Sequence, residues 1–376
     1  MSTLMLARRH RSSALPLALL AVGMVVYASL YPFADWRWPA GASLWELMWL
    51  PLPPQRYRFD IGANLLGYMP VAALIYGAGV RSGHRPRACW WLAVLGPTAL
   101  SYLMELTQQF LPQRYPSQLD WGLNALGSLA GATAAAAMQR LGLIDHWQAA
   151  RDRWFTPHSG GALALLLIWP LGLLFPTPIP LGLGPNWGRV QESLLDLLME
   201  TRGAEALLDW LADSPPSIGQ VSPLAEGAGV VLGLLGPCLL AFSVTRRGWR
   251  RAVMAAGAMG LGWAGTTLSA ALNFGPAHAM AWVTPVLLPA CAVALTLAAL
   301  LLAAPARLTA ALGIAVMSAG VMLVAQAPSD PYFALSLQAW EQGRFIHFHG
   351  LAQWVGWVWP LVALGWLAMH LAARET

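Results

Sequence analysis

Residues 60–79 read DIGANLLGYMPVAALIYGAG, an apolar run that begins with an aspartate and has an asparagine one helical turn later. An α-helix needs about 20 mostly apolar residues to cross a hydrocarbon core roughly 30 Å thick, and this run has that length. Similar runs recur along the chain. Together the expected spans are residues 14–33, 60–79, 89–110, 119–139, 160–179, 224–244, 252–273, 279–303, 308–327 and 351–373. The sequence therefore predicts an all-α, polytopic transmembrane helical bundle of about ten spans.

The composition agrees with a chain that lies mostly in lipid. Hydrophobic residues make up 57% of the 376 residues and charged residues only 10%, a share too small for a water-facing surface. Soluble domains usually carry about 25% charged residues. The net charge is +5. The chain has 22 basic residues, all of them arginine, and most of them lie in segments between apolar runs. This placement is typical of topology signals, so we expect no nucleic-acid partner.

The distribution of arginine also predicts the orientation of the chain. If the N-terminus is cytoplasmic, 15 of the 22 arginines lie in segments on the cytoplasmic side. Because positively charged residues are enriched in cytoplasmic loops, this bias favours an even number of spans with both termini in the cytoplasm. The expected location is the bacterial cytoplasmic (inner) membrane, as a multi-pass protein.

Two of the expected spans begin with the same pattern, D-x-G-x-N-x-L-G. It starts at Asp60 in one span and 60 residues later at Asp120 in the other. In each copy the aspartate and the asparagine (Asn64 and Asn124) are four residues apart, so they share one helix face. Both helices enter from the outer side, which places the two copies at equal depth. The pattern indicates two helical hairpins related as parallel repeats.

The span between these two adds a carboxylate at a similar level. Glu105 lies about one and a half turns, roughly 10 Å, below the predicted outer surface, since a helix rises 1.5 Å per residue. A charged side chain at the bilayer centre costs on the order of 2.5–3.5 kcal/mol, so such a group must face the bundle interior, pair with a cation or hold a proton. Arg114 is the nearest expected partner, with Arg56 and Arg58 as others. The set forms either a polar network that holds four helices together or a pocket open to the outer leaflet.

This region resembles the VanZ-like family, named for a protein associated with teicoplanin resistance. The family pattern has S-x-x-x-E-x-x-Q in one span, an Arg in the next turn, and then D-x-x-x-N-x-x-G-x-x-x-G. The matching residues in this chain are Asp60, Asn64, Pro70, Ser101, Glu105, Gln108, Arg114, Asp120, Asn124, Gly127 and Gly131. The chain departs from the family at Ala72, where a glycine is expected, and in its six further spans. The resemblance implies that the chain is related to this family, but it does not imply a particular reaction.

The resemblance also implies how the chain is divided. Residues 14–140 are expected to form a VanZ-like four-helix membrane domain, and residues 141–159 a cytoplasmic linker. Residues 160–376 are expected to form a six-span membrane region with an amphipathic extracytoplasmic insertion near residues 185–213. The candidate ligand-binding residues of the first part are Asp60, Asn64, Glu105, Gln108, Arg114, Asp120 and Asn124.

Other features predict anchoring at the membrane surface. The loop at residues 34–59 is rich in tryptophan, which prefers the level of the lipid headgroups, so we expect it to lie along the outer surface. The insertion near residues 185–213 has acidic residues on one helix face and leucines on the other, which favours interfacial helices. His347 and His349 have no third ligand nearby in the sequence, and we expect no metal and no cofactor.

Three functions fit this sequence. The leading hypothesis is a binding module for an amphiphile at the outer leaflet: a membrane lipid, a lipid-linked wall precursor or a lipoglycopeptide such as teicoplanin. The second is an enzyme acting on a lipid-linked envelope intermediate, with paired carboxylates as acid and base and Arg114 holding a phosphate. The sequence contains no established catalytic motif, which favours binding. The third is a proton-coupled transporter, which the clustering of charge at one face disfavours.

Overall fold

The computed structural model describes residues 14–31, 33, 35–39, 41, 43–52, 58–112, 114–157, 159–199, 205–212, 221–327 and 346–373. Within these residues the regular structure is helical, apart from one isolated bridge between Phe155 and Thr245. The prediction of an all-α chain is therefore confirmed. The chain forms two compact units, residues 1–150 and residues 151–376, and the division falls inside the segment expected to be a linker.

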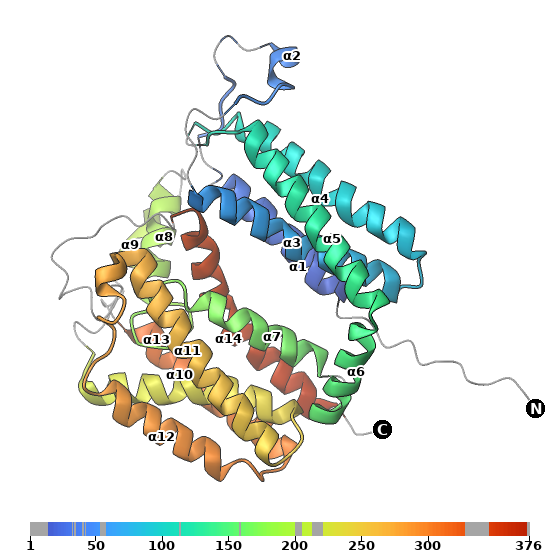
Figure 1. The fold of residues 1–376 in the computed structure, drawn as a ribbon. Coiled ribbons are helices and arrows are strands. Elements are labelled where there is room, and N and C mark those ends of the chain that lie inside the picture. The colour runs from blue at the N-terminus through green and yellow to red at the C-terminus, as the bar shows by residue number, and fades with distance from the viewer. Residues whose placement is uncertain are drawn as a thin grey trace, which may run out of the picture. The chain divides into compact units, whose positions relative to one another are not determined.

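The first unit is built from three long helices and the elements that cover them. The helices of this unit are α1 (Ala14–Leu30), α2 (Leu44–Leu47), α3 (Arg58–Arg81), α4 (Pro86–Gln108) and α5 (Gln118–Arg140), and α6 (Leu143–Trp154) leads into the second unit. α3 packs along both α5 and α4, and α1 packs against α3 and α4 (Figure 1). The predicted spans 60–79, 89–110 and 119–139 correspond to α3, α4 and α5.

Two glycines of α5 bring its backbone against that of α3. A Cβ atom added at Gly127 would lie 2.3 Å from the carbonyl oxygen of Leu65, and one added at Gly131 only 2.1 Å from that of Met69. Such distances are far inside van der Waals contact, so any side chain at these positions forces the helices apart. Small residues four positions apart are a common means of close helix packing in membranes. The second D-x-G-x-N-x-L-G copy thus ends in the glycine that begins this contact.

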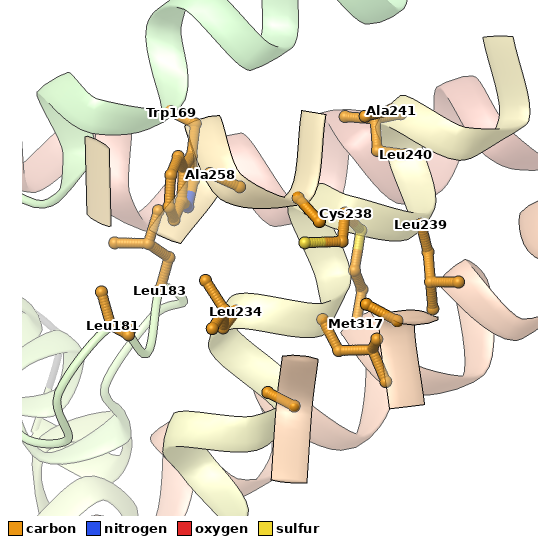
Figure 2. Close-up of a cluster of buried hydrophobic side chains, with 14 of the residues drawn as sticks. Trp169, Leu181, Leu183, Leu234, Cys238, Leu239, Leu240, Ala241, Ala258 and Met317 are labelled. Atoms are coloured by element: carbon orange, nitrogen blue, oxygen red, sulfur yellow. The ribbon is translucent and has the colours of Figure 1, made fainter. Parts of the chain in front are cut away.

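The second unit is arranged around α10 (Pro223–Val244). Its other helices are α7 (Gly160–Gly172), α8 (Trp187–Met199), α9 (Glu205–Ala212), α11 (Trp249–Phe274), η1 (Pro276–His278), α12 (Leu287–Leu300), α13 (Ala306–Gln326) and α14 (Ile346–Ala372). α10 packs against α7, α11, α12 and α13, and α14 packs against α7 and α13. The core is apolar and includes Leu234 and Cys238 of α10, Trp169 of α7 and Met317 of α13 (Figure 2).

A buried irregular connection, residues 173–186, joins α7 to α8 within this unit. The predicted span 160–179 is helical only as far as Gly172, because four prolines follow within the connection and a proline can neither donate a backbone hydrogen bond nor continue a helix. Leu181 adopts a positive φ of 61° and is only 2% exposed. Its carbonyl oxygen would lie 2.4 Å from a Cβ atom added at Gly233, about halfway along α10. The connection is therefore enclosed by the unit, although the sequence predicted an outer loop from residue 180 onward.

Four described helices are long and apolar enough to cross a membrane. They contain the segments Ile61–Arg81, Pro223–Val244, Ala306–Gln326 and Leu351–Ala372, and three shorter apolar helical segments are Leu17–Leu30, Gly160–Gly172 and Leu287–Leu300. These helices support the prediction of a membrane protein. The total of about ten spans and the cytoplasmic position of the termini stay predictions. α8 and α9 provide helices within the expected insertion, and their interfacial position also stays a prediction.

Candidate functional site

The buried carboxylate of Glu105 links the end of α4 to the beginning of α5. Glu105 is only 6% exposed, and its Oε2 accepts a hydrogen bond of 2.8 Å from the backbone N–H of Ser117. The Ser117 hydroxyl in turn accepts from the backbone N–H groups of Leu119 and Asp120, which caps α5. Glu105 therefore fixes the residue that starts the helix carrying Asp120.

The two copies of the repeated pattern meet through Asn64 and Asp120. The Asn64 side-chain amide donates to Asp120 Oδ1 over 2.6 Å, so the asparagine of α3 bonds to the aspartate of α5. Glu105 also lies close enough to Asp120 for the two carboxylates to interact electrostatically. The side chain of Asp60, the aspartate of the first copy, is outside the described part of the structure, as are those of Arg56 and Arg58.

One turn further along α5, Asn124 contacts α4 in a fully enclosed position. Its side-chain amide donates to Ser101 Oγ over 2.9 Å, and Ser101 also hydrogen-bonds with the hydroxyl of buried Tyr68 on α3. Asn124 is 4% exposed, and its Oδ1 has no hydrogen-bond partner among the described residues. Tyr68 was not predicted, although it lies four residues after Asn64 and so on the same face of α3. These bonds across three helices, together with those of Glu105 and Asp120, are called the polar ladder below.

Gln108 and Arg114 contact the carboxyl end of α1. The Gln108 amide donates to the carbonyl oxygen of Ser29 over 2.8 Å, and the Arg114 guanidinium donates to those of Ala28 and Tyr31, each over 2.8 Å. The last carbonyls of a helix lack partners within it and carry partial negative charge, so an arginine stabilises them. Burial lowers the pKa of the Arg114 guanidinium, and the nearby Glu105 carboxylate opposes that shift. Arg114 thus connects α1 to the polar ladder.

A groove with a cavity volume of about 460 Å³ opens beside Arg114. It is lined by Arg37, Trp38, Pro39, Gln109, Leu111, Pro112 and Arg114. The segment before α2 is held there because the backbone N–H of Arg37 donates to the carbonyl oxygen of Phe110 over 3.0 Å. The Trp38 ring meets the Phe110 ring edge-on, with centroids 5.4 Å apart. Two arginines line this groove, and no acidic residue does so among those the structure describes.

The Trp-rich segment lies across the ends of α4 and α5. The Gln109 amide donates to the carbonyl oxygen of Leu47 over 2.7 Å, and the Gln118 amide to that of Leu50 over 2.6 Å. Trp45 and Trp49 point outward, with 69% and 66% of their surfaces exposed. Exposed indoles at the end of a helical bundle are typical of the lipid headgroup level. The segment therefore forms the wall of the groove and presents an aromatic rim.

The structure brings most of the predicted site residues into two adjoining places. Asn64, Glu105, Asp120 and Asn124 belong to the polar ladder, whereas Arg114 belongs to the groove and interacts electrostatically with Glu105. Gln108 bonds to α1 instead. Of the seven lining residues of the groove, only Arg114 was predicted as a site residue, and the other six, among them Arg37, Trp38 and Gln109, were not. Within the described residues, no group of three or more His, Cys, Asp or Glu side chains is placed to hold a metal ion.

No family model, curated protein or solved structure matches this chain. The resemblance to the VanZ-like family therefore stays a prediction that rests on the order and spacing of the residues in α3, α4 and α5.

Proposed function

We propose that the first unit binds an amphiphilic envelope lipid or lipoglycopeptide at the outer leaflet, and thereby affects susceptibility to glycopeptides such as teicoplanin. The observation that carries this proposal is the groove at the end of α4, which adjoins the polar ladder through Arg114. Its volume of about 460 Å³ is in the range of ligand sites, which is about 300–1,000 Å³. Its lining combines the polar side chains of Arg37, Gln109 and Arg114 with apolar residues, as recognition of a lipid headgroup requires.

Glu105 has a positioning role in this proposal. It holds Ser117 at the start of α5 and interacts electrostatically with Arg114, which lines the groove. A glutamine at this position keeps an oxygen that accepts from Ser117 but loses the negative charge beside Arg114. Glu105→Gln therefore tests the electrostatic contribution while it leaves the hydrogen bond to α5 in place.

The experiment compares the lipids that copurify with the full-length protein and with Glu105→Gln. We expect the variant to retain about one tenth of the bound lipid, because without the Glu105 charge the Arg114 guanidinium is held less firmly beside the groove, and a hydrogen-bonded charged group is worth about 1.5 kcal/mol. Glu226→Gln is the matched control, because Glu226 is a carboxylate of α10 that hydrogen-bonds with Thr284 in the second unit. Glycopeptide susceptibility of cells expressing each variant should follow lipid retention. Equal lipid content and equal susceptibility for both variants would contradict the proposal.

A second candidate function is an enzyme acting on a lipid-linked envelope intermediate. It is favoured by the electrostatic proximity of Glu105 and Asp120, because neighbouring carboxylates can take separate acid and base roles. Arg114 is then the group that holds a phosphate. If the protein is such an enzyme, its deletion should cause an unprocessed lipid intermediate to accumulate. Expression of Glu226→Gln in the deletion strain should remove this intermediate, whereas expression of Glu105→Gln should not. That result would favour this function over binding.

A further inference from the structure

The groove beside α4 contains an arginine, Arg37, whose side chain does not stabilise the described fold through a hydrogen bond or ion pair. The Arg114 guanidinium donates two hydrogen bonds to carbonyl oxygens of α1. Arg37 differs, because its backbone is fixed by the bond to Phe110 while its exposed side chain has no hydrogen bond or ion pair with another described residue. The two arginines line one cavity, and its described lining contains no carboxylate. The groove is thus an electropositive recess. The backbone of Arg37 is held in place there, and its side chain is available to bind an anionic ligand.

We propose that this groove selects lipids whose headgroup is an anionic phosphodiester, and that Arg37 is the residue that determines this selectivity. The inference rests on the proposed function and names its ligand class. Guanidinium groups bind phosphate oxygens through paired hydrogen bonds, and a bound anion offsets the repulsion between two arginines in one cavity.

The surroundings of the groove indicate a lipid and not a soluble phosphate. Trp38, Pro39, Leu111 and Pro112 supply the apolar part of the lining, which suits the glycerol backbone and the first methylene groups of a lipid. The exposed indoles of Trp45 and Trp49 lie on the same segment of chain and place this end of the unit at the level of lipid headgroups. A headgroup in the groove leaves its acyl chains free to remain in the bilayer.

Arg37 gives a cleaner test than Arg114. Replacing Arg114 removes donors from the carboxyl end of α1 and so changes the fold as well as the charge. Replacing Arg37 keeps the backbone bond to Phe110, because that bond does not involve the side chain. Arg37→Gln removes the charge, Arg37→Lys keeps the charge but loses the planar pair of donors, and Arg87→Gln is a control at an exposed arginine near the other end of α4.

The experiment measures lipid binding to the full-length protein in detergent by native mass spectrometry, with phosphatidylglycerol, phosphatidylcholine and diacylglycerol as probes. We expect the wild type to prefer phosphatidylglycerol by about tenfold or more, and Arg37→Gln to lose about tenfold in affinity for this lipid alone. Arg37→Lys should fall between the two, and Arg87→Gln should match the wild type. Higher salt should reduce the preference.

Each other outcome overturns a defined part of the inference. Equal binding of the three lipids, with Arg37→Gln unchanged, would refute the selectivity, and the proposed function would stand if Glu105→Gln still lost lipid. Displacement of phosphatidylglycerol by inorganic phosphate at equal concentration would show a site for soluble phosphate instead of a lipid site. A wild type that binds none of the three lipids and carries no copurified lipid would refute both proposals.

Discussion

The two units use buried polar side chains in different ways. In the first unit, two such pairs bond side chain to side chain between helices, Asn64 with Asp120 and Asn124 with Ser101, beside others that bond to the backbone. In the second unit, they bond mainly to backbone carbonyl oxygens at helix ends and in connections. A side chain that serves a backbone carbonyl is occupied whenever the unit is folded, whereas a pair of side chains can exchange partners with a ligand. The polar residues of the first unit are therefore suited to recognition, and those of the second to holding the fold.

Arg251 and Asn186 illustrate the pattern in the second unit. The buried Arg251 guanidinium donates to the carbonyl oxygens of five residues, which are Phe242, Thr245, Leu301, Leu302 and Ala304. The Asn186 amide donates to those of Val324 and Ala327 at the carboxyl end of α13. Both side chains are 1% exposed. Each supplies side-chain donors to carbonyls at or just beyond helix ends, where the regular hydrogen bonds of the helix stop.

The largest expected effect comes from Arg251→Met, which tests whether the second unit depends on these carbonyl bonds. The change leaves several buried carbonyl oxygens without a donor, and each such loss costs about 1–3 kcal/mol, so we expect on the order of 3–5 kcal/mol in total. Thiol labelling during unfolding measures the two units separately. Cys238 and Cys291 are buried in the second unit and Cys89 is buried in the first.

In Arg251→Met, Cys238 and Cys291 should become reactive at lower temperature or denaturant than in the wild type, while Cys89 should not. Arg247→Met is the control, because Arg247 is an exposed arginine four residues before Arg251. Simultaneous exposure of all three thiols would show that the units unfold together and would break the comparison.

A smaller effect, of about 2–3 kcal/mol, is expected for Gly131→Ala in the first unit. The added methyl group overlaps the carbonyl of Met69 and separates α3 from α5. The next residue, Ala132, belongs to the same buried cluster as Cys89, so labelling of Cys89 should report the change. Gly122→Ala on the same helix should have little effect, since a Cβ atom there meets nothing within 4 Å. Equal labelling of Cys89 in the two variants would contradict the close contact.

The smallest expected effect on stability is a difference between substitutions of two buried asparagines, one in each unit. Asn186→Leu removes the side-chain donor from the carbonyls of Val324 and Ala327 at the end of α13 and should cost about 2 kcal/mol. Asn124→Leu removes an oxygen that has no partner among the described residues and leaves Ser101 beside Tyr68, so it should cost less than about 1 kcal/mol. Labelling of Cys238 and Cys89, respectively, measures the two costs. An Asn124→Leu cost as large as that of Asn186→Leu would mean that the polar ladder also serves mainly to hold the helices together.

Much of the first unit could be predicted because its pattern is local. The spacing of Asp60, Asn64, Asp120 and Asn124 indicated shared helix faces, and Asn64 does meet Asp120. The groove could not be predicted in this way. Arg37 reaches the end of α4 through a backbone bond from an irregular segment, and such a bond leaves no periodic pattern in the sequence.

The second unit shows a different limit of sequence analysis. The prolines after Gly172 predict the end of a helix, but they do not reveal whether the chain then leaves the membrane or remains enclosed. The answer depends on the glycines of α10, where Gly229 and Gly233 leave room for Ile179 and Leu181. Those glycines are more than 40 residues away along the chain, and glycine is frequent in membrane helices for many reasons.

The enclosed connection at residues 173–186 constrains the order in which the protein is made. Irregular backbone is stable in a membrane only where protein surrounds it, and here the surroundings include Val324 of α13 and Gly356 of α14. Both are synthesised long after the connection has left the ribosome. The nascent second unit must therefore wait, with α7 and α10 already made, until its last helix has been inserted. Quality control that samples the chain before that moment encounters an incomplete bundle.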